Sequence, residues 1–190
     1  WRKMLHRAIN VRNRHPDAPT HKCRLHCGVE ESMIHLAQCR QIAPFWQSLL
    51  RFCENLTPSY TRPRFPERAI IFGQWDDTRR PMGPMIARAA LRHGWKALYA
   101  NFTKAETAGK IFVHQRAYLD ALYSLRQSAL AAAVKLTHDH IKQIHAAGDP
   151  PGDTNSTIAT EIRPLVTRDP DTLVPIISDK FQFEIDQSRK

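Results

Sequence analysis

Long apolar runs are absent from this 190-residue sequence. A helix that crosses a bilayer needs roughly 18 or more consecutive apolar residues, and no stretch approaches that length. The first residues, WRKMLHRAINVRNRH, are basic and amphipathic, and they lack the apolar segment and small-residue cleavage site of a secretory signal. An initiator methionine is also missing. We therefore expect no membrane partner, and we expect the chain to be a fragment of a larger protein.

Cysteine is scarce, and its placement is uneven. Three of the four cysteines and three of the ten histidines lie in the segment HKCRLHCGVEESMIHLAQCRQIAPFW. The pattern C-x3-C-x7-H-x3-C is formed by Cys23, Cys27, His35 and Cys39. Two close pairs of sulfur or nitrogen ligands suit the tetrahedral coordination of a structural zinc ion. Because no secretory signal is visible, a metal site is favoured over a disulfide framework. The pattern predicts a Zn2+ site, and residues 23–39 are termed the knuckle below.

The local sequence fits this arrangement. Gly28, directly after the second cysteine, can adopt the positive φ that a tight turn often needs. Ser32 is a suitable N-cap for a helix that begins at Met33. On such a helix His35 and Cys39, four residues apart, lie on one face. We therefore expect two ligands from a loop and two from a helix.

Other residues compete for the ligand positions. His21 and His26 lie beside the first cysteine, and Cys23 and His26 also form a pair separated by two residues. We select Cys27 because the glycine after it fits a knuckle turn. Cys53 lies among apolar residues of a predicted helix, so we expect it to be a buried core thiol.

The charge of the chain is strongly positive and unevenly distributed. The formal net charge is +10, and residues 1–104 hold 18 Lys and Arg against 7 Asp and Glu. Residues 105–147 hold 5 against 3, and residues 148–190 hold 5 against 8. The positive excess therefore lies in the half that contains the knuckle. This placement favours a nucleic-acid partner over a general solubility effect.

The residues around the predicted site carry a family resemblance. They are Cys27-Gly28, Glu31-Ser32, His35-Leu36, Cys39 and Trp46. This run resembles the zinc-binding segment downstream of the reverse transcriptase in non-LTR (LINE-like) retrotransposon proteins, where the order is Cys, Cys-Gly, Glu-Thr or Glu-Ser, His-Leu, Cys and Trp. WRKMLHRAINV matches the basic helix that usually precedes it, and IIFG matches an apolar-Gly step that often follows. The match covers about the first 75 residues, and C-x3-C in place of the commoner C-x2-C leaves the subfamily open.

The resemblance implies a module that helps to hold template RNA or target DNA. Its partners are then RNA and/or DNA and the remainder of the parent reverse transcriptase, and its location is intracellular, in a nuclear ribonucleoprotein. Backbone phosphates need only positive groups. The candidate contacts are Arg2, Lys3, Arg7, Arg12, Arg14, Lys22, Arg24, Arg40, Arg62, Arg64 and Arg68. Trp1 or Trp46 can stack a base, although the helical spacing of Trp46 fits a core position better.

Catalytic motifs are not convincing in this sequence. QWDD at 74–77 resembles the aromatic-x-Asp-Asp signature of a polymerase, but its tryptophan adjoins the aspartates, and TRRPMGP follows where a return strand is needed. HPD at 15–17 lacks the second carboxylate and lysine of a restriction-like nuclease. HDH at 138–140 places its histidines on divergent sides of a helix. No Gly-rich phosphate loop or G-x-S-x-G elbow occurs. We expect the fragment not to be an enzyme, although its parent is an RNA-directed DNA polymerase.

The apolar periodicity predicts a mainly α fold. The knuckle is followed by a helical bundle with a long C-terminal helix and an irregular tail. Helices are predicted over 43–56 and from Pro84 toward Lys104, with a loop at 57–66 between them. One long or broken helix is predicted over 106–145. Its inward stripe is Tyr118, Leu122, Leu125, Ala129, Ala133, Leu136, His140 and Ile144. This narrow stripe suits close packing or helix-mediated self-association.

The composition changes at Gly148. GDPPGDTNST is typical of a linker, and Pro164, Pro170 and Pro175 exclude a long regular element. LVPIISDKFQFEI predicts one or two short strands or an extended arm. The predicted division is 1–58 (basic N-terminal helix, knuckle and following helix), 59–147 (helical region) and 148–190 (linker and tail).

The alternative function is a purely structural, zinc-stapled helical module that mediates protein–protein contacts.

Overall fold

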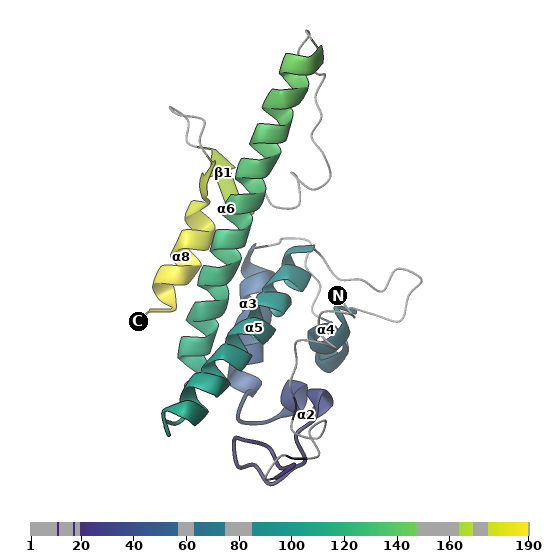
Figure 1. Ribbon diagram of the computed structural model, residues 1–190, viewed down its shortest axis with the longest axis vertical. Coiled ribbons are helices and arrows are strands. Elements are labelled where there is room, and N and C mark those ends of the chain that lie inside the picture. The colour runs from purple at the N-terminus through teal and green to yellow at the C-terminus, as the bar shows by residue number, and fades with distance from the viewer. Residues whose placement is uncertain are drawn as a thin grey trace. The chain divides into compact units, whose positions relative to one another are not determined.

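Helices make up most of the described chain, which confirms the predicted mainly α fold (Figure 1). The computed structural model describes residues 11, 17, 20–56, 63–74, 85–147, 164–168 and 175–189. Six helices are described: α2 (Met33–Gln38), α3 (Ala43–Leu56), α4 (Pro66–Phe72), α5 (Met85–Thr107), α6 (His114–Ala147) and α8 (Asp179–Gln187). The strands β1 (Val166–Arg168) and β2 (Pro175–Ile177) form one antiparallel pair. Within the described ranges no helix has the length and apolar character that crossing a membrane requires.

The chain divides into two compact units, 1–121 and 122–190, and the boundary lies within α6. Each unit is described separately below. The predicted division at residues 58 and 147 stays a prediction. The predicted N-terminal helix and the linker that begins at Gly148 lie outside the described residues, apart from Val11, which is buried.

The core of the first unit is made by α3 and α5. The helix α3 has the bounds that its apolar spacing predicts, and its inward residues are all buried: Phe45, Trp46, Leu49, Leu50, Phe52 and Leu56. Gly94 of α5 lies against this face. A Cβ at Gly94 would lie 2.4 Å from Leu49 Cδ1 and 3.2 Å from Trp46 Cζ3, so glycine allows this close helix crossing without a shift of the Leu49 side chain.

The helix α5 extends slightly beyond its prediction and also contacts α4. Its predicted inward residues are buried: Ile86, Ala90, Leu91, Trp95 and Leu98. The Trp95 indole donates a 2.7 Å hydrogen bond to the Ile70 carbonyl of α4. The helix α4 was not predicted, although Pro66 at its first position is a known helix-start signal. The predicted loop therefore ends at Phe65.

A break separates α5 from α6. The sequence left open whether residues 106–145 form one helix or a broken one; α5 ends at Thr107 and α6 begins at His114. Gly109 adopts φ +59°, and the Lys110 N–H donates to the Ala105 carbonyl at 2.8 Å. These features form a Schellman helix end, for which glycine is the preferred residue. Beyond the turn, Asn101 Nδ2 of α5 donates to Asp120 Oδ2 of α6 at 2.9 Å.

The second unit contains the rest of α6, the β-hairpin and α8. The predicted stripe on α6 is buried at Leu122, Leu125, Ala129 and Ala133. Val166 pairs with Ile177 and Arg168 with Pro175 in the hairpin, so the short strands expected in the tail are present. The tail also contains α8, which was not predicted.

The helix α8 has a clear local cause. Ser178 is its N-cap: the Ser178 hydroxyl accepts from the Phe181 N–H at 3.3 Å and donates to the Pro164 carbonyl at 2.7 Å. Phe181 and Ile185 are buried at helical spacing. Arg189 contacts Tyr123 of α6 through a hydrogen bond and a cation–π interaction. The tail is therefore more regular than its prolines indicate.

Candidate metal centre

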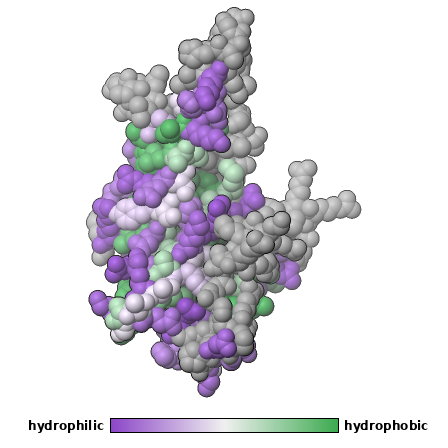
Figure 2. Space-filling model, in the orientation of Figure 1, coloured by the Kyte–Doolittle hydropathy of each residue, from purple (hydrophilic) through white to green (hydrophobic). Residues whose placement is uncertain are grey.

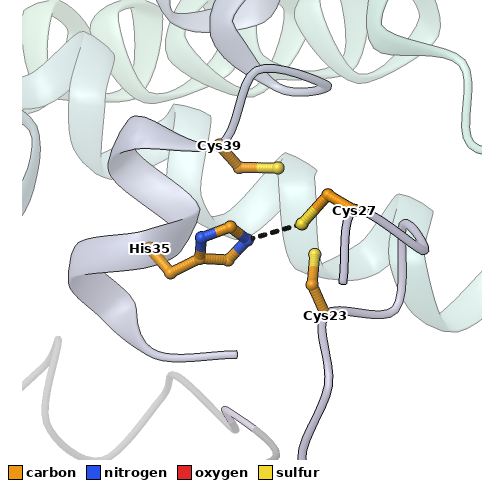
Figure 3. A group of neighbouring side chains, drawn as sticks. All are labelled: Cys23, Cys27, His35 and Cys39. Atoms are coloured by element: carbon orange, nitrogen blue, oxygen red, sulfur yellow. Dashed lines mark hydrogen bonds between the residues drawn. The ribbon is translucent and has the colours of Figure 1, made fainter. Parts of the chain in front are cut away.

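The four predicted ligands lie together at the knuckle (Figure 3). Their ligand atoms all lie within 4.8 Å of one another, and Cys27 Sγ lies 3.1 Å from His35 Nε2. In a tetrahedral site with zinc–sulfur distances of about 2.3 Å, neighbouring sulfurs are about 3.8 Å apart. The observed separations require shifts of only about 1 Å or less to match that geometry. No other group of this kind is found among the described residues.

A tight turn positions the two loop cysteines. Cys23 N–H donates to the Val29 carbonyl at 2.8 Å, and His26 N–H donates to the Cys23 carbonyl at 2.9 Å. Gly28 has φ +84°, which confirms the positive φ expected there. His26 also has a positive φ, +56°, an uncommon conformation for a residue with a Cβ. These bonds point the two thiols toward α2.

The helix α2 positions the other two ligands. It begins at Met33 as predicted, and the Ser32 hydroxyl accepts from the His35 N–H at 3.0 Å. It ends at Gln38, so Cys39 is the C-cap rather than part of the helix, with ψ 123°. The Cys39 carbonyl instead accepts from the N–H groups of Ile42 and Ala43 at the start of α3. The expectation of one helical face is therefore corrected: the two side chains still converge, but across a helix end.

The thiols of the cluster have unequal proton affinities. Burial, together with the neighbouring thiols, raises the pKa of Cys23 to about 12, and burial raises the pKa of Cys39. Burial also opposes ionisation of Cys27, but the Val29 N–H and the two other thiols donate hydrogen bonds that lower its pKa. Three neighbouring thiolates repel one another, so their joint deprotonation requires a bound cation. The arrangement suits a divalent soft metal ion.

The remaining cysteine and the competing histidines do not belong to the cluster. The structure places Cys27 in it, whereas His26 is exposed on the turn. Cys53 is fully buried in α3, as expected of a core thiol, and burial raises its pKa. The sequence thus distinguished the four clustered residues from their neighbours.

A buried ion pair supports the knuckle from behind the cluster. The Arg24 guanidinium donates to both carboxylate oxygens of Glu31, at 2.8 Å from Nε and 2.7 Å from Nη2, and Glu31 is 0 % exposed. The backbone N–H of Arg24 also donates to Glu31. The same guanidinium lies 5.2 Å from the ring centroid of Phe102 and 5.7 Å from that of Tyr99, both on α5. Arg24 therefore joins the knuckle to α5.

This contact changes the interpretation of Arg24. It was predicted as a phosphate contact, but its donors face Glu31, and Nη1 lies 3.7 Å from the Glu106 carboxylate. A guanidinium held by two carboxylates and two rings is a structural group. The role of Glu31 was not predicted, although its place in the Glu-Ser pair of the family pattern was noted.

The other predicted phosphate contacts divide into two groups. Lys22, Arg40, Arg64 and Arg68 are exposed, and the Arg64 and Arg68 guanidinium carbons lie 5.4 and 5.0 Å from the ring centroid of Phe65. The remaining residues lie outside the described ranges: Arg2, Lys3, Arg7, Arg12, Arg14 and Arg62. Trp1 also lies outside them.

Other motifs from the sequence offer no second site among the described residues. Trp46 is buried and its indole donates to the Leu36 carbonyl at 3.0 Å, so it is a core residue. Most of QWDD and HPD lies outside the described residues. In HDH, His138 is exposed on α6.

Comparison of the chain with family models, with curated proteins and with solved structures finds no match. Its function is therefore inferred from its own residues: a Cys3His cluster on a basic, helical chain.

Proposed function

We propose that the chain is a zinc-stabilised nucleic-acid-binding module from the C-terminal part of a non-LTR retrotransposon reverse transcriptase. The observation that carries this proposal is the Cys3His cluster, whose ligand atoms lie within 4.8 Å of one another. Three sulfurs and one imidazole nitrogen are typical ligands of structural zinc. A closed set of four protein ligands has no open position for water or substrate, so the ion stabilises the fold and does not catalyse a reaction.

The nucleic-acid part of the proposal rests on charge. The knuckle and α4 present Lys22, Arg40, Arg64 and Arg68 at the surface, within the half of the chain that holds 18 Lys and Arg against 7 Asp and Glu. Contacts from lysine and arginine to backbone phosphates carry no information about the base sequence. Binding is then salt-dependent and weakly sequence-specific.

The position in a reverse transcriptase rests on the resemblance of the knuckle residues and of Trp46. In that setting the module holds template RNA or target DNA while the polymerase domain of the parent protein acts. No set of residues in the described chain suggests chemistry of its own, so this fragment is proposed as a binding module.

The zinc site is tested by metal analysis of the purified chain. We expect one equivalent of zinc, its loss in Cys39→Ser, and its retention in the matched control Cys53→Ala, which removes the thiol outside the cluster. Zinc that survives Cys39→Ser, or a chain that binds no zinc, contradicts the proposed site.

The binding function is tested by titration. Labelled single-stranded RNA and duplex DNA are titrated with the zinc-loaded chain at low and moderate salt, and fluorescence anisotropy is measured. We expect affinity that falls steeply with salt. A zinc-loaded chain that binds neither probe contradicts the nucleic-acid function and leaves the structural alternative.

That alternative, a zinc-stapled module for protein contacts, is favoured by one observation. Arg24 links the knuckle to α5 through Glu31, Glu106 and two aromatic rings. A metal centre anchored in this way can serve to fix the helices alone. The titration above separates the two functions, because only the first predicts salt-sensitive binding.

A further inference from the structure

One face of α5 is basic, and the sequence analysis did not single it out. Of the 23 residues of the helix, 11 are buried, including Trp95 and Leu98. The outward face carries Arg88, Arg92 and Lys96, each four residues from the next and thus about one turn apart. In Figure 1 α5 lies in front of α3, and Figure 2 shows hydrophilic side chains over this part of the surface. These three residues are termed the α5 stripe.

The α5 stripe has no carboxylate partner among the described residues. No ion pair there involves Arg88, Arg92 or Lys96. The first acidic residue of α5 is Glu106, and its carboxylate faces Arg24 at 3.7 Å. Among the described residues, these positive charges therefore have no carboxylate that neutralises them.

Arg88 shows the same lack in its hydrogen bonding. Its Nε is buried and has no hydrogen-bond partner, the one such side-chain atom among the described residues. A buried donor without an acceptor costs about 1–3 kcal/mol. Arg88 as a residue is only half-buried, and a phosphate that contacts its guanidinium can supply acceptors that the described residues do not.

A neighbouring buried histidine senses the field of the stripe. His93 is 7 % exposed, and its pKa is lowered to about 4, first by burial and then by the charges of Lys96 and Arg92. Two of the three stripe charges therefore act on a side chain that is buried beside them.

The spacing of the stripe suits a strand of phosphates. Four residues of helix rise about 6 Å, so the three charges extend over about 12 Å. A strand of duplex nucleic acid presents one phosphate per about 3.4 Å of axis, so this length spans about three or four phosphates.

The stripe also lies in the same unit as the basic surface already proposed. Arg88 is half-buried and lies seven residues before the buried Trp95, so it stands at the edge of the outward face, and the Trp95 indole donates to the Ile70 carbonyl of α4. Arg64 and Arg68 lie at the start of α4. The two basic groups therefore belong to the same compact unit.

We propose that Arg88, Arg92 and Lys96 form a backbone-binding surface that holds the phosphates of one nucleic-acid strand without reading its sequence. This inference rests on the proposed function and gives it a location on a helix outside the knuckle. Zinc then supports the unit that presents the stripe, and the contacts themselves are made by α5 and by the basic residues of α4.

The test compares two triple variants with the same change of charge. Arg88→Gln/Arg92→Gln/Lys96→Gln removes the stripe, and Lys104→Gln/Lys110→Gln/Arg116→Gln removes three exposed charges at the other end of α5 and the start of α6. Each is titrated with duplex DNA of arbitrary sequence at several salt concentrations. We expect the stripe variant to bind about tenfold or more weakly and the slope of log K against log salt to decrease by about 2.7, as for three lost phosphate contacts. The control should change the slope by less than about one.

Two further measurements keep the outcome clear. Arg88→Lys/Arg92→Lys preserves charge and should keep the wild-type slope, and zinc content with circular dichroism shows that each variant is folded. Equal slopes for the two triple variants overturn the stripe while leaving the proposed function intact. A zinc-loaded wild-type chain that binds no nucleic acid overturns both. The same holds if polyglutamate displaces the labelled DNA from the wild-type chain as effectively as unlabelled DNA does.

Discussion

The knuckle and the α3–α5 helix pair are held together by different forces. In the knuckle the buried residues include two ligand cysteines and the Glu31 carboxylate. In the helix pair the buried residues are large and apolar, and Phe45, Phe52 and Leu49 are 0 % exposed. The helix pair therefore depends on apolar burial and close packing, whereas the knuckle has a buried ion pair and the four clustered residues that we propose to bind zinc.

This difference shows how a short segment can keep a defined shape. The knuckle is too small to bury an apolar core of its own, so ligand bonds and charge take the place of apolar area. Its links to the rest of the unit include Arg24 on α5, the Trp46 indole on the Leu36 carbonyl, and the packing of α2 against α4. Each of the following changes should therefore affect one region more than the other.

The largest effect is expected from removal of the metal. Chelation, or Cys39→Ser, removes a contribution on the order of 10 kcal/mol of apparent folding free energy from the knuckle. We expect the amides of residues 21–39 to lose hydrogen-exchange protection while those of α3 and α5 keep it. Equal loss in both regions shows that the helix pair also depends on zinc, and the comparison then fails.

The next effect is expected from Arg24→Met. The substitution leaves the Glu31 carboxylate buried without its partner, and breaking such a pair costs about 3–5 kcal/mol. Urea unfolding should show this loss while the chain still binds zinc. The double variant Arg24→Met/Glu31→Met should recover part of the stability, because no buried charge remains. A loss below about 0.5 kcal/mol for the single variant contradicts the anchoring role, because surface substitutions cause changes of that size.

A pH effect is expected in the helix pair. Burial lowers the pKa of His93 to about 4 in the folded chain, from an ordinary value of about 6.5 in the unfolded chain. As the pH falls, the unfolded chain therefore takes up the proton first. The contribution of neutral His93 is complete above about pH 6.5 and is lost as pH falls toward 4, by about 3 kcal/mol in total. The stability difference between wild type and His93→Gln should shrink by this amount over that range. Because acid removes zinc from both chains, the difference isolates His93, and a constant difference contradicts the prediction.

The smallest effect is expected from Gly94→Ala. The added Cβ lies 2.4 Å from Leu49 Cδ1, and overpacking of this kind costs about 1–3 kcal/mol, reduced by about 1 kcal/mol through the better helix propensity of alanine. Thermal unfolding should reveal a small loss in the helix pair with unchanged zinc content. In the control Leu49→Ala/Gly94→Ala the two losses should not add, because the first substitution removes the atom that the new Cβ meets. Simple additivity means that the crossing tolerates a Cβ.

Sequence reasoning succeeded where a signal is local. The bounds of α3, the N-cap Ser32, the positive φ of Gly28 and the four clustered ligands all follow from spacing and residue type. Helix periodicity and metal-ligand spacing act over fewer than about 20 residues, so they can be recognised without a fold. The end of α5 at Gly109 had such a signal too, but it was not used.

Sequence reasoning failed where distant residues meet. The basic residue Arg24 looks like its exposed neighbour Lys22 in the sequence, and only the positions of Glu31 and α5 make it an anchor. The α5 stripe was missed because its charges are single residues between apolar ones, and their shared face exists only once the other faces of the helix are packed. The helix α8 was missed because the prolines before it hid the Ser178 cap.

The sequence by itself determined the helical class, the ligand set and the excess of positive charge, because each depends on residue type and short spacing. The tertiary structure alone decided which positive charges are neutralised inside the unit and which face outward. That decision depends on the packing of α2, α4 and α5, since a guanidinium beside a buried carboxylate and one on an open helix face differ only in what surrounds them.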